Sequence, residues 1–300
     1  MKKLVKKAVN RLGYELVKRD SSPVVKGDFW EDWFYKYPSE LTDAYVFNRK
    51  QLSQVEGWLD EEIHRDSYWG YGVPGYLMNG RYKYNLNFNP FELTYTDLLC
   101  MLGRKMGEVK YLEIGVSAGK NFYQMYNSLG KSGLYGMDIE SINPTIEKFL
   151  SGKSKTWEAD EEVDFRNGKN EMVKKRYSKH EYSFPSSENK VTYLSGDKFD
   201  SLLWEQLAGV QFNLIFSDAF HRPASIKDEY EKLKEYDLIH KADFIMAWDD
   251  MESAEMQLAF QQICEDMCKN VFPGRQASFK VYDLHGTYAG KHTIGLFWTV

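Results

Sequence analysis

The sequence predicts an α/β fold in which a largely parallel sheet carries helices on both faces. From about residue 93 to residue 300, short apolar runs alternate with longer stretches of helical spacing. Several of these apolar runs end on an acidic residue, and the first of them is followed by a turn that contains two glycines. Because parallel strands end at the same edge of a sheet, the acidic residues are expected to line one rim, where such folds bind ligands.

Length and composition indicate a folded globular chain. Its 300 residues are enough for one large domain, or for one domain with an appended N-terminal region. Apolar residues make up 43% and charged residues 28%, as in ordinary globular proteins, and the formal charge of -5 argues against a general nucleic-acid binder. Three cysteines are too few and odd in number for a disulfide framework, which fits the reducing cytoplasm. No apolar run is long enough to cross a bilayer, and no secretory signal is expected.

The first 92 residues are expected to form an N-terminal region that precedes a domain at 93–300. Seven lysines and arginines surround apolar positions in residues 1–20, which predicts a basic amphipathic helix. Such a helix either attaches weakly to an anionic membrane surface or packs as an ordinary terminal helix. Aromatic clusters at 29–35 and 68–71 favour a cap over the mouth of the sheet that selects a ligand. A structural flap or an oligomer contact is the alternative for this region.

A strand, a glycine turn and a helix form the centre of the predicted domain. The apolar run 110–115 leads into a turn at Gly115 and Gly119, after which helical spacing resumes. Glycines let the backbone approach a ligand closely, and the amides that open the helix can hold a carboxylate or phosphate. A second strand, 134–138, ends on Asp138, which can accept hydrogen bonds from both hydroxyls of a ribose. The loop lacks the middle glycine of a dinucleotide fingerprint, so an adenosine-bearing ligand other than NAD is favoured, with a plain strand-to-helix turn as the alternative.

The remaining elements follow in order along the chain. Further strands are expected at 191–197, 212–218, 242–248, 278–284 and 293–299. Helices are expected at 93–103, 144–150, 199–207, 224–240 and 253–270. The last two strands follow one another without a helix, so they are expected to pair as an antiparallel hairpin. Residues 151–190 are polar and charged, and they are expected to be an insertion, either a functional loop or a disordered segment.

The segment 112–119, LEIGVSAG, resembles the first motif of class I S-adenosylmethionine (SAM) dependent methyltransferases. The resemblance covers roughly residues 94–300 and implies a Rossmann-like mixed sheet of seven strands in the order 3-2-1-4-5-7-6, with helices on both faces. It also implies that SAM is held by Glu113, Gly115, Ser117, Gly119, Asn121, Asp138 and Asp197. The family pattern sets Asp197 against the adenine edge, and capping of the following helix is the simpler alternative there.

Acidic residues end the fourth and fifth strands of this pattern, which are neighbours in such a sheet. Their position brings Asp218, Asp249 and Asp250 together, and three converging carboxylates repel one another unless protons or a cation intervene. Oxygen ligands in that number suit Mg²⁺, or Ca²⁺ or Mn²⁺, better than zinc. Capping of a turn or helix is the alternative role for each of the three.

This arrangement is similar to that of Mg²⁺-dependent O-methyltransferases that act on catechols or on the sugars of macrolide antibiotics. In those enzymes an Asp after strand four and a pair of residues after strand five hold the metal, which matches the positions of Asp218, Asp249 and Asp250. In the catechol branch a basic residue three positions after the first Asp removes the proton of the acceptor. His221 stands at that position, and a histidine titrates near neutrality. A surface histidine without a catalytic role is the alternative.

The expected function is therefore that of a cytoplasmic O-methyltransferase that uses SAM and Mg²⁺, with His221 as general base beside Asp218. The expected acceptor is a hydroxyl of a small molecule, or of a sugar or glycan precursor. Two alternatives remain: a metal-independent methyltransferase that acts on oxygen or nitrogen, and a non-catalytic binding or scaffold protein of the same fold. No nucleic-acid partner is expected, and the oligomeric state is left open.

Overall fold

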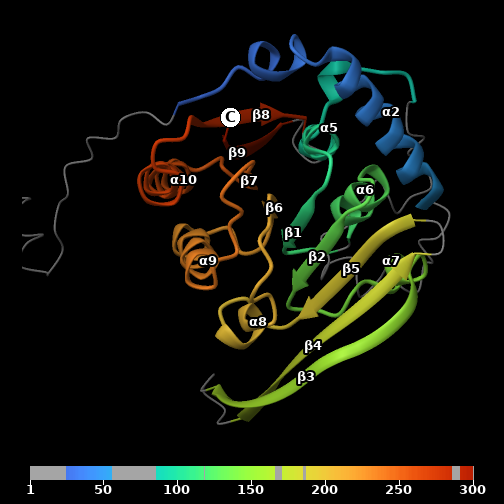
Figure 1. Cartoon of the computed structure of the whole chain (residues 1–300), viewed down its shortest axis with the longest axis vertical. Helices are drawn as coiled ribbons and strands as arrows, with labels where there is room; N and C mark the ends of the chain where they lie inside the picture. The colour runs from blue at the N-terminus through green and yellow to red at the C-terminus, as the bar shows by residue number, and fades with distance from the viewer. Residues whose placement is uncertain are drawn as a thin grey trace, which may run out of the picture.

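A computed structural model of the chain describes residues 25–55, 86–117, 119–165, 171–184, 187–285 and 291–299. The predicted basic helix at 1–20 and the aromatic cluster at 68–71 lie outside these residues. The described strands form one sheet, in the order β3-β4-β5-β2-β1-β6-β7-β9-β8. Helices cover both of its faces, and the predicted α/β fold with helices on both faces is confirmed (Figure 1).

The centre of the sheet is parallel. It consists of β1 (Lys110–Ile114), β2 (Gly133–Asp138), β5 (Ser187–Ser195), β6 (Leu214–Ser217) and β7 (Ile245–Trp248). Their apolar side chains are buried on both faces, as the continuous apolar runs in the sequence predict. The sheet ends at one margin with β9 (His292–Thr299) and β8 (Ala277–Leu284), which pair antiparallel as the predicted hairpin.

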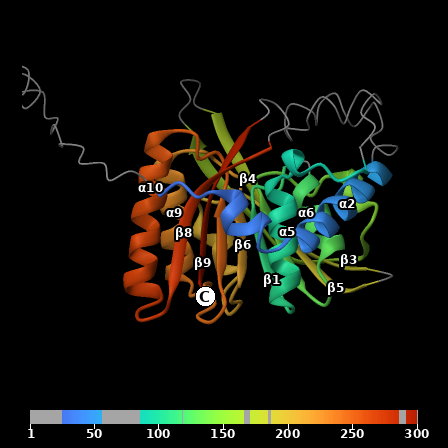
Figure 2. The ribbon, with the colours of Figure 1, turned by 90° about the horizontal axis from the view of Figure 1, so that it is seen from above.

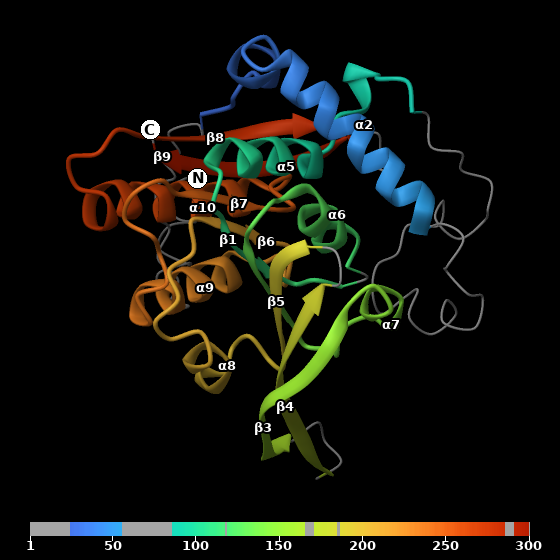
Figure 3. The ribbon, with the colours of Figure 1, turned by 45° about the vertical axis from the view of Figure 1, so that its right-hand side comes forward.

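In the described residues the sheet has nine strands, so the predicted count of seven is wrong, and the predicted order does not describe the whole sheet. Residues of the expected polar insertion form two long strands, β3 (Ser151–Phe165) and β4 (Glu171–Phe184), which add to β5 at the other margin (Figure 3). Oppositely charged residues stand at paired positions of this hairpin, for example Asp160 opposite Arg176. The other seven strands keep the relative order 3-2-1-4-5-7-6 when they alone are numbered along the chain.

Two hydrophobic cores lie on the two faces of the sheet. The core on one face packs the sheet against α2 (Pro38–Val55), α5 (Tyr95–Met106) and α6 (Lys120–Ser128). The core on the other face packs it against α8 (Ser201–Glu205), α9 (Pro223–Glu235) and α10 (Ala254–Asp266), which continues into η4 (Met267–Val271). The short helix α7 (Pro144–Glu147) follows β2.

Local sequence explains where the longer helices begin. The Thr94 hydroxyl accepts from the Asp97 amide and the Asp97 carboxylate accepts from the Thr94 amide, so a capping box opens α5. Pro223 opens α9, where its fixed φ suits the first helical turn. The Ser253 hydroxyl accepts from the Met256 amide and caps α10. These residues determine where the helices beside the carboxyl ends of β6 and β7 begin.

The described part of the predicted N-terminal cap shares a core with the rest of the chain. Its helix α2 lies on the outer side of α5 and α6 (Figure 2), whereas η1 (Trp30–Phe34) packs against β8 and β9, where the Trp33 ring contacts the Trp298 ring. Phe29 and Trp33 are buried in the core of that face. At the other end of the region, η3 (Pro90–Glu92) leads into α5. The role of this region in selecting an acceptor stays a prediction.

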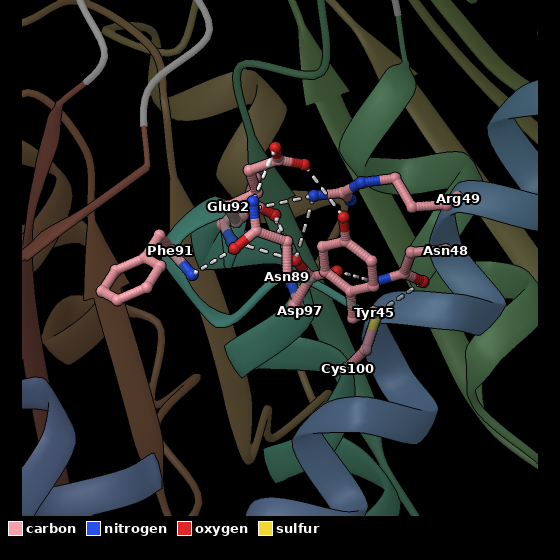
Figure 4. Close-up of polar contacts among 9 residues, drawn as sticks. Tyr45, Asn48, Arg49, Asn89, Phe91, Glu92, Asp97 and Cys100 are labelled. Carbon is pink, nitrogen blue, oxygen red and sulfur yellow. Dashed lines mark hydrogen bonds and ion pairs between the residues drawn. The ribbon is translucent and has the colours of Figure 1, made fainter. Parts of the chain in front are cut away.

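Polar contacts attach α2 to η3 and α5 (Figure 4). The Arg49 guanidinium donates to the Glu92 carbonyl oxygen at 2.9 Å and lies 3.5 Å from the Asp97 carboxylate. Asn48 donates to Asp97 at 2.8 Å, and the Tyr45 hydroxyl donates to the Glu92 carboxylate at 3.0 Å. Because Asp97 also belongs to the capping box of α5, the N-terminal region and the start of α5 form one connected unit.

Among the described helices, none combines the length and apolar character needed to cross a bilayer. Cys100, Cys264 and Cys268 are free thiols, two of them buried and one half-buried.

Candidate active site

The loop after β1 has the backbone that its glycines predict. Gly115 and Gly119 have φ of 86° and 78°, in the left-handed region that favours glycine, and Ser117 also has a positive φ of 51°. The Gly115 amide donates to the Met137 carbonyl oxygen at 2.7 Å, which ties the loop to the end of β2. Gly119 is the N-cap of α6, so the loop passes directly into a helix N-terminus.

Asp138 at the end of β2 faces this loop. One of its carboxylate oxygens accepts from the Ser117 amide at 2.7 Å, and the other accepts from the Glu140 amide at 3.0 Å. Each oxygen keeps further acceptor capacity, since a carboxylate offers about four lone-pair sites. Ser117 takes part through its backbone amide, and the cofactor contacts predicted for Ser117 and Asp138 stay predictions.

Glu113 and Asn121 lie beneath the loop and are buried. The Glu113 carboxylate accepts from the Tyr111 hydroxyl at 2.6 Å and from the Asn121 side-chain amide at 2.8 Å. Burial raises the pKa of Glu113 to about 8, although these hydrogen bonds act in the opposite direction. Both residues support the loop from below, and direct contact of either one with a cofactor stays a prediction.

Asp197 follows β5, next to β2, and the Gly196 amide donates to the Asp138 carbonyl oxygen at 2.8 Å. The Asp197 carboxylate accepts from the Phe199 amide at 3.1 Å, but the N-cap of α8 is Asp200, so Asp197 does not cap that helix, and its adenine contact stays a prediction. Two large apolar side chains at these strand ends remain in contact with solvent: Ile139 is 71% exposed and Phe199 is 45% exposed. The sequence reasoning missed both, although an apolar residue one or two positions after a strand-end aspartate was a readable signal.

The acidic residues after β6 and β7 lie at the same rim as the glycine loop. The Asp218 amide donates to the Ile114 carbonyl oxygen at 2.8 Å, and the Asp249 amide donates to the Ser217 carbonyl oxygen at 2.9 Å. These two hydrogen bonds link the ends of β1, β6 and β7 in turn. Asp218 therefore lies beside Gly115 and near Asp249, as the predicted site requires.

His221 lies between two of the predicted carboxylates. Its Nε2 is 3.5 Å from an oxygen of Asp218, and its Nδ1 is 3.3 Å from an oxygen of Asp250. Burial and the neighbouring Asp249 carboxylate, which contacts Asp218, raise the pKa of Asp218 well above its ordinary value. The same two causes raise the pKa of Asp250. Such shifts mark carboxylates that are crowded enough to favour a proton or a cation between them.

The structure adds a histidine that the sequence reasoning missed. The His292 Nε2 contacts the Asp249 carboxylate, and donor atoms of Asp249, Asp250 and His292 all lie within 4.8 Å of one another. Burial opposes protonation of His292, but the Asp249 carboxylate outweighs it and raises the pKa of the imidazole. His292 opens β9, which pairs with β7, so it reaches Asp249 only through a strand pairing that the sequence alone does not show.

A buried ion pair lies beneath the end of β6. The Lys198 ammonium contacts the Glu229 carboxylate, and these side chains are only 9% and 1% exposed. The Ser217 hydroxyl donates to the same carboxylate at 2.6 Å. The residue that precedes Asp218 is thus held by a polar network that reaches α9.

A cavity of about 640 Å³ lies at the opposite edge of the sheet, where β1 and β6 begin. Its lining includes Lys110, Asn213, His240 and Asp243, and it contains none of the predicted site residues. Asn213 already accepts from the Lys110 amide at 2.8 Å and donates to the Glu108 carbonyl oxygen at 3.0 Å. Residues of this edge therefore serve as controls for changes at the rim.

No protein-family model matches the sequence, and no curated protein matches it. Among solved structures, the chain is similar to the O-methyltransferase TomG from Streptomyces achromogenes in complex with SAM, at 13% identity, 93% coverage of each chain and a TM-score of 0.45. It is also similar to cofactor-bound Rv0187 from MTB, at 16% identity and a TM-score of 0.40 over 68% of this chain and 78% of that chain. The N-methyltransferase NodS from Bradyrhizobium japonicum WM9, in complex with S-adenosylhomocysteine, has 12% identity and a TM-score of 0.41 over 78% of this chain and 98% of that chain. Similarity at this level does not fix an activity, so the function has to come from the residues of the site.

Proposed function

We propose that the protein is a SAM-dependent methyltransferase that moves a methyl group to a hydroxyl of a small molecule or of a sugar or glycan precursor. The observation that carries this proposal is that two chemically different groups of residues meet at one sheet rim. The first group consists of the glycine loop, Asp138 and Asp197. The second group consists of the carboxylates of Asp218, Asp249 and Asp250 and the imidazoles of His221 and His292.

The first group suits the adenosine part of SAM. The glycine loop offers a backbone without side chains in the way, and α6 begins directly after it, with the positive end of its helix dipole at the loop. The Asp138 carboxylate can accept from ribose hydroxyls. Ile139 and Phe199 present exposed apolar surface at the same strand ends, which suits the faces of a flat base.

The second group suits removal of a proton from a hydroxyl. In the transfer, the acceptor oxygen forms a bond to the methyl carbon while the sulfonium–carbon bond breaks, and the acceptor loses its proton. The distances from His221 to its two carboxylates exceed those of strong hydrogen bonds, so the imidazole can turn a nitrogen toward an acceptor and take that proton. The resulting imidazolium lies between Asp218 and Asp250, which stabilise its charge.

The donor atoms in the second group also fit a divalent cation. Asp249, Asp250 and His292 each offer a ligand atom within 4.8 Å of the others, and Asp218 contacts Asp249. A cation held there lowers the pKa of a hydroxyl that coordinates it. The predicted set of Asp218, Asp249 and Asp250 is thereby extended by one imidazole.

Isothermal titration of the full-length protein with S-adenosylhomocysteine tests the cofactor half. We expect binding, and we expect Asp138→Ala to weaken it by about 10- to 100-fold, the effect of losing hydrogen bonds to a charged group. Asp243→Ala removes an exposed carboxylate at the opposite edge of the sheet and should bind as the wild type does. If the folded wild type binds neither SAM nor S-adenosylhomocysteine, the alternative of a non-catalytic scaffold protein is favoured.

Transfer of a labelled methyl group from SAM to panels of hydroxyl and amine acceptors tests the reaction. We expect transfer to hydroxyls, a loss of about 10²- to 10⁴-fold in His221→Ala, and a loss on treatment with EDTA that a divalent cation reverses. Full activity in chelator would remove the cation from the proposal and leave the methyltransferase. Transfer to amines alone would overturn the O-methyltransferase assignment.

A further inference from the structure

An imidazole faces the carboxylates at the end of β7. His292 contacts Asp249, whose side chain is only 4% exposed, and Asp250 completes a group whose donor atoms lie within 4.8 Å of one another. Two of these donors are oxygens and the third is a nitrogen. The sequence-based expectation placed only oxygen donors here.

Neighbouring side chains fix the position of His292. The Tyr95 ring at the start of α5 packs against the imidazole with ring centroids 5.2 Å apart. The next residue, Thr293, donates through its amide to the Glu252 carboxylate and through its hydroxyl to the Asp283 carboxylate, both at 2.9 Å. The imidazole is therefore held in place by its surroundings, as a preorganised ligand would be.

A nitrogen donor changes which cations a site prefers. Mg²⁺ takes hard oxygen ligands, keeps several waters and gains little from an imidazole. The divalent first-row transition metals bind nitrogen as well as oxygen, and among them Mn²⁺ is the one best suited to a site that is mainly carboxylate. A group with two carboxylates and one imidazole thus favours Mn²⁺ over Mg²⁺.

We propose that Asp249, Asp250 and His292 form a mixed nitrogen–oxygen metal site that prefers Mn²⁺ to Mg²⁺, and that His292 sets this preference. The inference rests on the metal-assisted function proposed above. It replaces Mg²⁺, the cation expected from the sequence, with a transition metal.

Metal binding to the chelator-treated full-length protein tests this site without any acceptor. Titrations with MnCl₂ and MgCl₂ should give an affinity for Mn²⁺ at least about tenfold higher than for Mg²⁺. His292→Asn keeps a polar side chain but supplies no imidazole nitrogen, and it should reduce the ratio to within about threefold. His240→Asn removes an imidazole from the cavity at the opposite edge and should leave the ratio unchanged. Thermal unfolding of each variant shows whether it is folded.

A spectroscopic measurement on the wild type does not depend on any variant. Electron spin-echo modulation of bound Mn²⁺ should show coupling to an imidazole nitrogen, and its absence would overturn the role of His292. Equal affinities for the two cations, or an unchanged preference in a folded His292→Asn, would overturn it as well. If neither cation binds, Asp249 and His292 are a metal-free ion pair and the metal site is wrong.

Binding of S-adenosylhomocysteine is measured separately on the same protein. If S-adenosylhomocysteine binds but Mn²⁺ is not preferred, only this inference is wrong. If Mn²⁺ is preferred but S-adenosylhomocysteine does not bind, the proposed function is wrong and the metal site stands.

Discussion

The backbone of Gly115 lies directly against the backbone of Asp218. A Cβ added at Gly115 would come within 2.4 Å of the Asp218 carbonyl oxygen. This contact places the glycine loop beside the carboxylates, since it joins the end of β1 to the end of β6. The two halves of the proposed site should therefore respond together to a change at either residue.

Gly115→Ala is expected to weaken S-adenosylhomocysteine binding by more than about tenfold, because the added methyl group displaces both the loop and Asp218. Gly107→Ala is the matched control. Gly107 has a similar φ of 82°, but nothing lies within 4 Å of an added Cβ, so this variant should lose only about 1–3 kcal/mol of stability to backbone strain. Isothermal titration and thermal unfolding separate the effects, and equal binding losses in the two variants would contradict the expectation.

Phe199→Ala is expected to reduce the affinity for S-adenosylhomocysteine by about tenfold, because the proposed adenine would lose an aromatic contact. Phe91→Ala is the control, since Phe91 is also exposed, at 76%, but lies on η3. Titration calorimetry under identical conditions compares the two. If Phe199→Ala binds as the wild type does, the base does not lie on that side chain.

Glu113→Gln should change how stability depends on pH. The folded-state pKa of Glu113 is raised to about 8 from 4.5, so folding favours its protonated form. The stabilisation from this group is complete below about pH 4.5 and is lost as the pH rises through about 8. Glu113→Gln cannot ionise, and near pH 8 its free energy of unfolding should exceed that of the wild type by an amount on the order of 3 kcal/mol.

Urea unfolding of wild type and Glu113→Gln between pH 5 and pH 8.5 measures this difference. Glu181→Gln, an exposed carboxyl on β4, should give a wild-type profile. A constant difference between Glu113→Gln and wild type across this range would show that Glu113 does not carry the pH dependence.

Lys198→Met should lower the free energy of unfolding by about 3–5 kcal/mol, because it leaves the buried Glu229 carboxylate without its cation. Lys198→Met combined with Glu229→Leu should recover most of this loss, since the double variant leaves no unpaired charge. Urea unfolding of the two variants provides the comparison. A double variant as unstable as Lys198→Met would mean that the ion pair itself stabilises the fold.

Much of the parallel sheet could be predicted because its strands are buried on both faces and so appear in the sequence as continuous apolar runs. The positions of Asp218, Asp249 and Asp250 followed from the same runs, since each lies just beyond the end of a strand. Chain direction alone then placed them at the rim that holds Gly115. The pattern did not show that Glu113 is buried beneath the loop, because burial of a polar side chain depends on partners such as Tyr111.

The β3–β4 hairpin escaped prediction because charges paired across the two strands occupy positions where the sequence analysis looked for apolar residues. His292 escaped for a different reason. It reaches Asp249 only through the antiparallel pairing of β9 with β7, a contact between residues 43 positions apart in the chain. No local pattern around His292 reports that pairing.

The hairpin also determines which strand forms this margin of the sheet. Without it, the outermost strand would be β5, with its apolar Val191 and Tyr193. With it, the outermost strand is β3, whose register is interrupted twice and which exposes Lys153 and Lys155 to solvent. Irregular, charged margins are poor templates for the addition of a strand from another molecule. The polar insertion thus protects the sheet against edge-to-edge aggregation, a task separate from any chemistry at the rim.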